Sequence, residues 1–196
     1  MRLLTTPEVA KRLGVTVSRV QVLINDRRLP AQKIGRDFMV REVDLVLVGS
    51  RQPGRTPAQL QLDYWMAFRD FVLSRSKILK PPPAKAQRNM IIKTRRGCRL
   101  AASFHMKDRQ IWVDLTFGRD SKKYFQRLEK NHDSIEEQIG FELEWVARPE
   151  GIESWILVRE PADPAIRGDW ARQYSWLCEK LEKFSTVLLP KLASLR

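Results

Sequence analysis

The sequence contains few residues of the types that build metal centres and phosphate-binding loops. Only two cysteines, Cys98 and Cys178, and two histidines, His105 and His132, occur among 196 residues. Their scattered positions do not match the spacing of zinc ligands, so we expect free buried thiols in a reducing compartment. The nine glycines are spread thinly and form no phosphate-cradling loop. We therefore expect no metal and no cofactor.

Long hydrophobic runs are also missing. No apolar stretch approaches the length that spans a membrane, and the opening residues MRLLTT lead into a helix-capping pattern instead of a secretory signal. We expect a cytoplasmic protein without a membrane partner.

Acidic residues are scarce in the first half of the chain. Residues 1–100 contain 21 Lys and Arg against 7 Asp and Glu, whereas residues 101–196 contain 15 against 16. The net charge of +13 therefore resides in the first half. Charge that serves only solubility is usually spread along a chain, so this asymmetry favours a polyanion such as nucleic acid as the partner.

Residues 5–30 read as two short helices around a glycine turn. Thr5 can cap the first helix with Glu8 at the reciprocal capping-box position, and Gly14 supplies the turn that ends it. Thr16 can cap the second helix, whose buried face is expected to contain Val20, Leu23 and Ile24.

A small β-hairpin is expected in QKIGRDFMV (residues 32–40), with Ile34 and Phe38 packed inward, and a third short helix in residues 41–48. A break rich in glycine and basic residues follows. We place a first domain at residues 1–49, a linker at 50–55 and a second domain at 56–196.

The second domain combines helical and strand patterns. A long helix is predicted from Thr56-Pro57 to about Ser76, followed by strands at 90–94, 98–106 and 111–117. A helix from Ser121 to about Ile139, a hairpin over 141–160 and a final helix ending before Pro190 complete the order. This order predicts an α+β fold with a mostly antiparallel sheet flanked by helices.

The outer face of the second helix carries groups suited to reading DNA. Ser18, Val22 and Asn25 project opposite the buried face, and Arg19 flanks them. Hydroxyl, amide and guanidinium groups suit base edges and phosphates, and an exposed Val suits a thymine methyl. A merely solvated helix surface is the alternative, although it would more often carry Lys and Glu. Lys33 and Arg36 place two cations on the hairpin.

This arrangement resembles the small winged helix-turn-helix of the excisionase and MerR-related group. The resemblance covers residues 4–45 and rests on T-x-x-E-x-A-x-x-LGV, LP-A-x-K-IGR and a hydrophobic wing strand. It implies a recognition helix in the major groove and a wing on the adjacent backbone of double-stranded DNA. The residues expected to contact DNA are Thr16, Ser18, Arg19, Val22, Arg28, Lys33 and Arg36. The long dimer helix of MerR proteins is missing, so excisionase-like binding or transcription regulation fits better than ligand sensing.

Residues from about 62 to 195 resemble an uncharacterised domain family of bacterial and archaeal proteins, some of them associated with restriction or defence. The resemblance rests on YWMAFRDFV, IWVDLTF, YFQRLEKNHDSIEEQIG and DWARQYSWLCEKLEKF. It implies no known chemistry, and hints at a mobile element or phage defence. Homodimerisation, a protein partner or added backbone contact remain open for residues 56–196.

The alternative to a binding protein is a restriction-type nuclease, or a component of one, targeted by the winged helix. Asp114, Glu142 and Glu144 are candidate metal-binding acids, but the lysine of an acid-x-lysine motif is missing, and these positions fit a solvated sheet face. We therefore expect no catalytic residues. The basic segment 85–99 either extends the DNA contact or forms an ordinary solvated hairpin. Its candidate residues are Lys85, Arg88, Lys93, Arg95, Arg96 and Arg99.

Overall fold

The computed structural model describes residues 2–13, 15–26, 29–35, 37–45, 56–148 and 150–195. The chain divides into two compact units: residues 1–56 with 164–171, and residues 57–163 with 172–196. The linker predicted at residues 50–55 lies outside the described ranges. The predicted domain borders therefore stay predictions.

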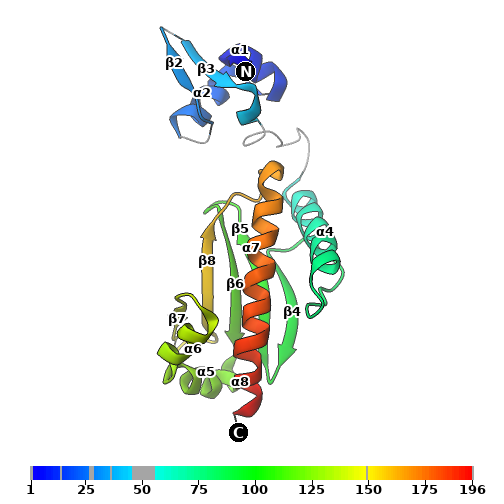
Figure 1. The fold of residues 1–196 in the computed structure, drawn as a ribbon, viewed down its shortest axis with the longest axis vertical. Coiled ribbons are helices and arrows are strands. Elements are labelled where there is room, and N and C mark those ends of the chain that lie inside the picture. The colour runs from blue at the N-terminus through cyan, green and yellow to red at the C-terminus, as the bar shows by residue number, and fades with distance from the viewer. Residues whose placement is uncertain are drawn as a thin grey trace. The chain divides into compact units, whose positions relative to one another are not determined.

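The first unit packs two short helices against a three-stranded sheet (Figure 1). Its elements are β1 (Leu3–Thr5), α1 (Thr6–Leu13), α2 (Val17–Asn25), β2 (Gln32–Ile34), β3 (Asp37–Arg41) and the 3-10 turn η1 (Glu42–Asp44). The strand order is β1-β3-β2, and both pairings are antiparallel. The core consists of Leu4, Val9, Ala10, Val20, Leu23, Leu29, Val40 and Leu45.

The reciprocal, Glu8 half of the predicted capping box is present at the start of α1. The carboxylate of Glu8 accepts hydrogen bonds from the backbone N–H of Thr5 at 2.8 Å and from its hydroxyl at 2.9 Å. These bonds hold the pKa of Glu8 below its ordinary value. The sequence patterns did not predict β1, because a three-residue strand forms only through its partner, and Leu4 lies opposite Val40 of β3. Gly14, the predicted end of the helix, lies outside the described residues.

The second unit contains a five-stranded antiparallel sheet in the order β4-β5-β6-β8-β7. The strands are β4 (Asn89–Arg95), β5 (Cys98–His105), β6 (Gln110–Phe117), β7 (Glu144–Val146) and β8 (Ser154–Pro161). The helices are α4 (Pro57–Arg75), α5 (Lys122–Glu129), α6 (His132–Ile139), α7 (Trp170–Lys183) and α8 (Leu189–Ser194). The short turn η2 (Arg119–Ser121) and the π turn η4 (Phe184–Leu188) complete it. The turn η3 (Arg167–Asp169) and the first two residues of α7 fall in the segment 164–171, which groups with the first unit. The predicted α+β class is confirmed.

Both α4 and α7 lie over one face of this sheet (Figure 1). Phe104 of β5 stacks on Trp65 of α4 with ring centroids 5.1 Å apart, and Phe117 of β6 packs edge-on against Phe125 of α5. The alternation of β6 is as predicted, because Ile111, Val113, Leu115 and Phe117 are all fully buried on this face. Both cysteines are free and buried, and burial raises the pKa of each thiol.

Two predicted helices have different ends in the structure. The helix predicted over residues 121–139 is broken into α5 and α6, and Gly140 ends the second part in the left-handed conformation. Pro190 does not follow the last helix but lies in the first turn of α8. Proline lacks the N–H that an α-helix interior needs. The π turn η4 directly before it changes the bonding pattern, so that the chain passes through Pro190 without a break in helical direction.

Candidate nucleic-acid interface

Helix α2 is held in place by a cap and by one buried face. The side chain of Thr16 accepts a 3.2 Å hydrogen bond from the backbone N–H of Arg19, as the capping pattern predicts. Val20 and Leu23 are 0% and 4% exposed and belong to the same core as residues of α1 and β3. Ile24 is only partly buried against that core. The orientation of α2 in the first unit is therefore determined by its apolar side.

The opposite side of α2 is exposed, as predicted. Thr16, Ser18 and Val22 face solvent, and Val22 is 42% exposed although it is apolar. Arg19 is half-buried at the margin of this surface. Gln21 and Asn25, which flank the same surface, are exposed too. The structure thus places Ser18, Arg19 and Val22 on α2 away from its buried residues, with Thr16 at the N-terminal cap of the helix. Arg28 lies outside the described residues.

The hairpin of β2 and β3 projects from the same small core. Lys33 on β2 is exposed and lies opposite Phe38 of β3, and Gly35 at the turn has φ +62°. Arg36, the second predicted cation of the wing, lies outside the described residues. The inward packing predicted for Ile34 is wrong, since this side chain is 49% exposed at the end of a two-stranded projection. Phe38 is half-buried.

Ion pairs at the base of the hairpin fasten it to the rest of the unit. Arg12 of α1 pairs with Glu42, which directly follows β3. The guanidinium of Arg41 forms a bidentate ion pair with the carboxylate of Asp44, in which Nε donates at 2.6 Å and Nη2 at 2.7 Å. Asp44 is buried, so this pair positions the last residue of β3 with little freedom. Helix α2 and the hairpin are therefore presented by one packed unit.

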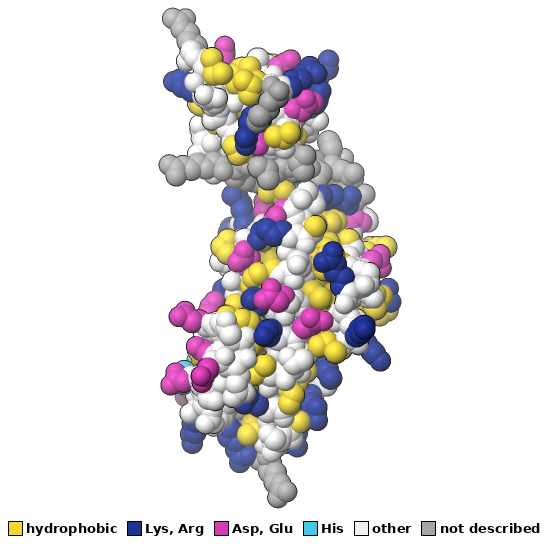
Figure 2. Space-filling model, viewed as in Figure 1, with side chains coloured by type: hydrophobic (Ala, Val, Ile, Leu, Met, Phe, Trp, Pro, Cys, Tyr) yellow, Lys and Arg dark blue, Asp and Glu magenta, His cyan; other side chains and the backbone are white. Residues whose placement is uncertain are grey.

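In the second unit, the six predicted cations fall into two groups. Arg96 donates to the backbone carbonyl of Leu195 and lies over the ring of Tyr124, and Arg99 pairs with Glu153. The other four are exposed, and none has an ion-pair partner within the described ranges. They are Lys85, Arg88, Lys93 and Arg95. Figure 2 shows Lys and Arg side chains recurring down the side of this unit where α4 and β4 lie.

The interpretation of Asp114 as an acid on a solvated sheet face is wrong. Asp114 is 6% exposed, and it accepts hydrogen bonds from the hydroxyls of Ser103 at 3.0 Å and Thr116 at 2.7 Å. Burial removes solvent from this carboxyl group and raises its pKa. The hydrogen bonds oppose that rise but do not cancel it.

The three predicted acids do not converge. Asp114 and Glu144 lie on either side of Leu157, so two strand spacings, or about 10 Å, separate their backbones. Glu144 pairs with Arg159 at 3.1 Å, and Glu142 is exposed ahead of β7. Within the residues that the structure describes, no three His, Cys, Asp or Glu side chains form a group that could hold a metal ion.

No helix among the described residues is long and apolar enough to cross a membrane. No curated protein and no solved structure is similar enough to this chain to count as a match. Residues 3–47, which contain α1, α2 and the hairpin, match the family model of a helix-turn-helix domain, and such a domain suggests DNA binding. Residues 60–191 match the model described as a domain of unknown function, DUF4268. Because this second match spans more than half of the chain, the protein belongs to the DUF4268 family and carries a helix-turn-helix domain ahead of its family domain.

Proposed function

We propose that the first unit binds double-stranded DNA with a preference for sequence, as an excisionase-like protein or transcription regulator. Helix α2 would enter the major groove, and the hairpin of β2 and β3 would act as a wing on the adjacent backbone. The observation that carries this proposal is the exposed surface of α2, which combines small hydroxyls with an apolar Val22 at 42% exposure.

The side chains on this surface match the chemistry of a groove. The hydroxyls of Thr16 and Ser18 can donate to phosphate or base edges, and the guanidinium of Arg19 can contact guanine with two N–H groups. Val22 offers its methyl groups to the methyl group of thymine, which removes apolar surface on both molecules from water. Lys33 on the wing adds a charge contact that carries no sequence information.

The charge of the chain supports the same ligand. Residues 1–100 carry an excess of fourteen cations, since they contain 21 Lys and Arg against 7 Asp and Glu. Cations that neutralise phosphates release counterions, so the affinity should fall steeply with salt. Binding that is the same at roughly 50 mM and roughly 200 mM salt would contradict an electrostatic contact.

We infer that the protein binds and positions DNA without cutting it. The burial of Asp114 and its distance from Glu144 favour binding over a restriction-type nuclease. A duplex incubated with the protein and Mg²⁺ or Mn²⁺ is expected to remain intact. Metal-dependent cutting that disappears in the Asp114→Ala variant would establish the nuclease instead. A nucleoid-associated role in a mobile element or in phage defence is the setting that we propose.

Selection from a random duplex pool tests the proposal directly. The full-length protein should enrich one short motif, and a two-fold symmetric motif would also indicate a dimer. The Arg19→Ala variant should enrich a motif that is degenerate at one position. If the sequences recovered with the wild-type protein shared no motif, sequence preference would be contradicted.

A further inference from the structure

Strand β4 is an edge of the five-stranded sheet, and a bulge changes where its cations point. Before the bulge, Met90 lies opposite Ala102, on the face covered by helices, and Ile91 lies opposite Ala101 on the other face. The register then shifts by one residue, so that Lys93 lies opposite Leu100 and Arg95 opposite Cys98.

Residues that face each other across two strands point to the same side of a sheet. Without the extra residue, strict alternation would have placed Lys93 and Arg95 on the side of Ile91. With it, they share the helix-covered side with Met90 and with Arg88, whose carbonyl accepts from the N–H of Phe104 at 3.0 Å, but at the edge of the sheet they remain exposed. Three cations therefore follow one margin of β4 over about 20 Å.

The charge along this margin is uncompensated. The chain contains no acidic residue between Asp70 and Asp108. Arg88, Lys93 and Arg95 are exposed, and within the described part of the chain they have no ion-pair partner.

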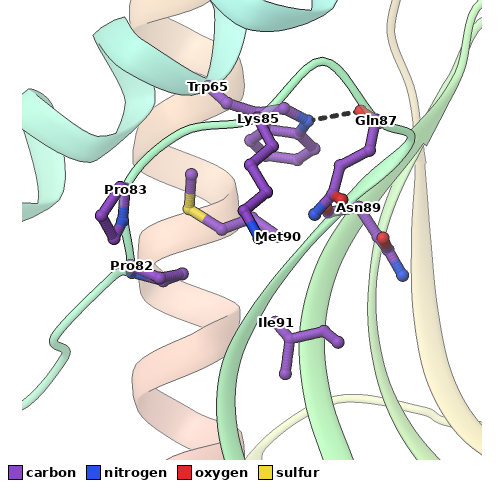
Figure 3. Close-up of a pocket in the computed structure, with 8 residues that line it drawn as sticks. All are labelled: Trp65, Pro82, Pro83, Lys85, Gln87, Asn89, Met90 and Ile91. Atoms are coloured by element: carbon purple, nitrogen blue, oxygen red, sulfur yellow. Dashed lines mark hydrogen bonds between the residues drawn. The ribbon is translucent and has the colours of Figure 1, made fainter.

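A slot adjoins the N-terminal end of β4. It has a volume of about 480 Å³ and lies between Pro82 and Pro83 on one side and the start of β4 on the other (Figure 3). The side chain of Lys85 extends across it (Figure 3). The indole N–H of Trp65 donates to the carbonyl of Gln87 at 2.8 Å, which holds the loop that bears Lys85 and Arg88. Lys85, the fourth cation, therefore lies at this slot and not on a flat surface.

We propose that this margin of β4 is a second contact surface for the phosphate backbone of duplex DNA, formed by Lys85, Arg88, Lys93 and Arg95. Charge complementarity supports this occupant, because the margin offers cations that have no ion-pair partner among the described residues. One strand of the duplex rises 3.4 Å per nucleotide, so the margin faces several consecutive phosphates. The inference rests on the proposed function only in taking DNA as the ligand, and it assigns a binding role to the DUF4268 domain itself.

Edge protection is the competing explanation, since natural proteins place Lys and bulges on edge strands to prevent pairing with other chains. The two explanations predict different effects of these cations on the salt dependence of DNA affinity. Cations that contact phosphates contribute about 0.9 each to the slope of log affinity against log salt. Cations that only keep other strands away contribute nothing to that slope, and their loss promotes self-association.

The test uses the full-length protein and a labelled duplex of fixed length. The variant combines Lys85→Gln, Arg88→Gln, Lys93→Gln and Arg95→Gln. The matched control combines Lys107→Gln, Lys123→Gln, Lys130→Gln and Lys183→Gln, which removes the same charge from exposed residues that are not on β4 or its loop. Affinity is measured at several salt concentrations, and light scattering reports the oligomeric state.

The β4 variant should lower the salt slope by about 3 to 4, and the control by less than about 1. A wild-type slope in the β4 variant, with or without self-association, would overturn the proposal. Equal slope losses in both variants would also overturn it, because they would reflect net charge alone. The proposed function would be rejected, and this inference retained, if Arg19→Ala left the sequence preference unchanged while the β4 variant still lowered the salt slope. A full-length protein that binds no duplex at low salt would overturn both.

Discussion

The side chain of Thr16 accepts a 3.2 Å hydrogen bond from the backbone N–H of Arg19, and this contact begins helix α2. The same first turn carries three of the residues that we propose contact DNA. Under the proposed function, helix formation and DNA recognition are coupled at one residue, because the cap that orders the turn also sets the position of Ser18 and Arg19.

Replacing Thr16 with alanine should make the start of α2 open more often. Loss of an N-cap costs about 1 kcal/mol, which corresponds to about a fivefold faster hydrogen exchange for amides that exchange by local opening of α2. The Thr16→Ser variant keeps the hydroxyl and should exchange within about twofold of wild type. Unchanged exchange in Thr16→Ala would show that packing of Val20 and Leu23 alone holds the helix.

Arg19 and Lys33 should contribute differently to DNA binding. The Arg19→Ala variant should lose discrimination at one base position by about 1–3 kcal/mol. The Lys33→Ala variant should weaken binding to all sequences alike and lower the salt slope by about 1. Affinities for the selected motif and for single-base variants of it provide the measurement. If Lys33→Ala changed sequence preference as much as Arg19→Ala, the roles assigned to helix and wing would be wrong.

A buried polar pair joins the first and last long helices of the second unit. The Tyr64 hydroxyl donates to Oε1 of Gln173 at 3.0 Å, and Nε2 of Gln173 donates to the carbonyl of Asp163 at 3.0 Å. Tyr64 and Gln173 are fully buried. The Tyr64→Phe variant removes one donor to a buried amide, so it should destabilise this unit by about 1–3 kcal/mol.

Denaturant unfolding followed by tryptophan fluorescence measures this loss, because five of the six tryptophans lie in the second unit. Tyr124→Phe is the control, since Tyr124 is half-buried and its hydroxyl contacts Arg96 only at 3.5 Å. It should cost less than about 0.5 kcal/mol, as surface substitutions usually do. Equal losses for the two variants would contradict the importance of the buried pair.

Asp114 should make the stability of the second unit depend on pH. Burial raises the pKa of its carboxyl group in the folded protein, so the folded state binds a proton more tightly than the unfolded state. Wild-type stability should therefore fall as pH rises from the ordinary pKa of 3.8 through the raised value. The slope cannot exceed about 1.4 kcal/mol per pH unit for one group.

The Asp114→Asn variant lacks this titration and serves as the reference. The unfolding free energy of the wild type minus that of the variant should increase as the pH is lowered through that window. A constant difference would show that the hydrogen bonds from Ser103 and Thr116 cancel the effect of burial, and a change in the opposite direction would show that they outweigh it.

Predictions from the sequence succeeded where the interaction is local. A helix cap joins residues three apart, so Thr16 and Arg19 were predictable, and the alternation of Ile111, Val113, Leu115 and Phe117 identified one face of β6. The exposed surface of α2 followed from helical period and the position of Val20 and Leu23. The burial of Asp114 could not be predicted in this way, because β6 is paired on both sides and one of the two hydroxyls that donate to Asp114 comes from Ser103 of β5.

The sequence by itself determined where α1, α2 and α4 begin, which side of α2 is apolar and where the positive charge is concentrated, because each depends on neighbours within one turn or on composition. Only the tertiary structure decided which basic residues are available. Arg96 and Arg99 are engaged by Leu195 and Glu153, which are distant in the chain. Lys93 and Arg95 share a side with Arg88 because a bulge in the pairing with β5 shifts their register. Such pairings depend on strand contacts that no local pattern encodes.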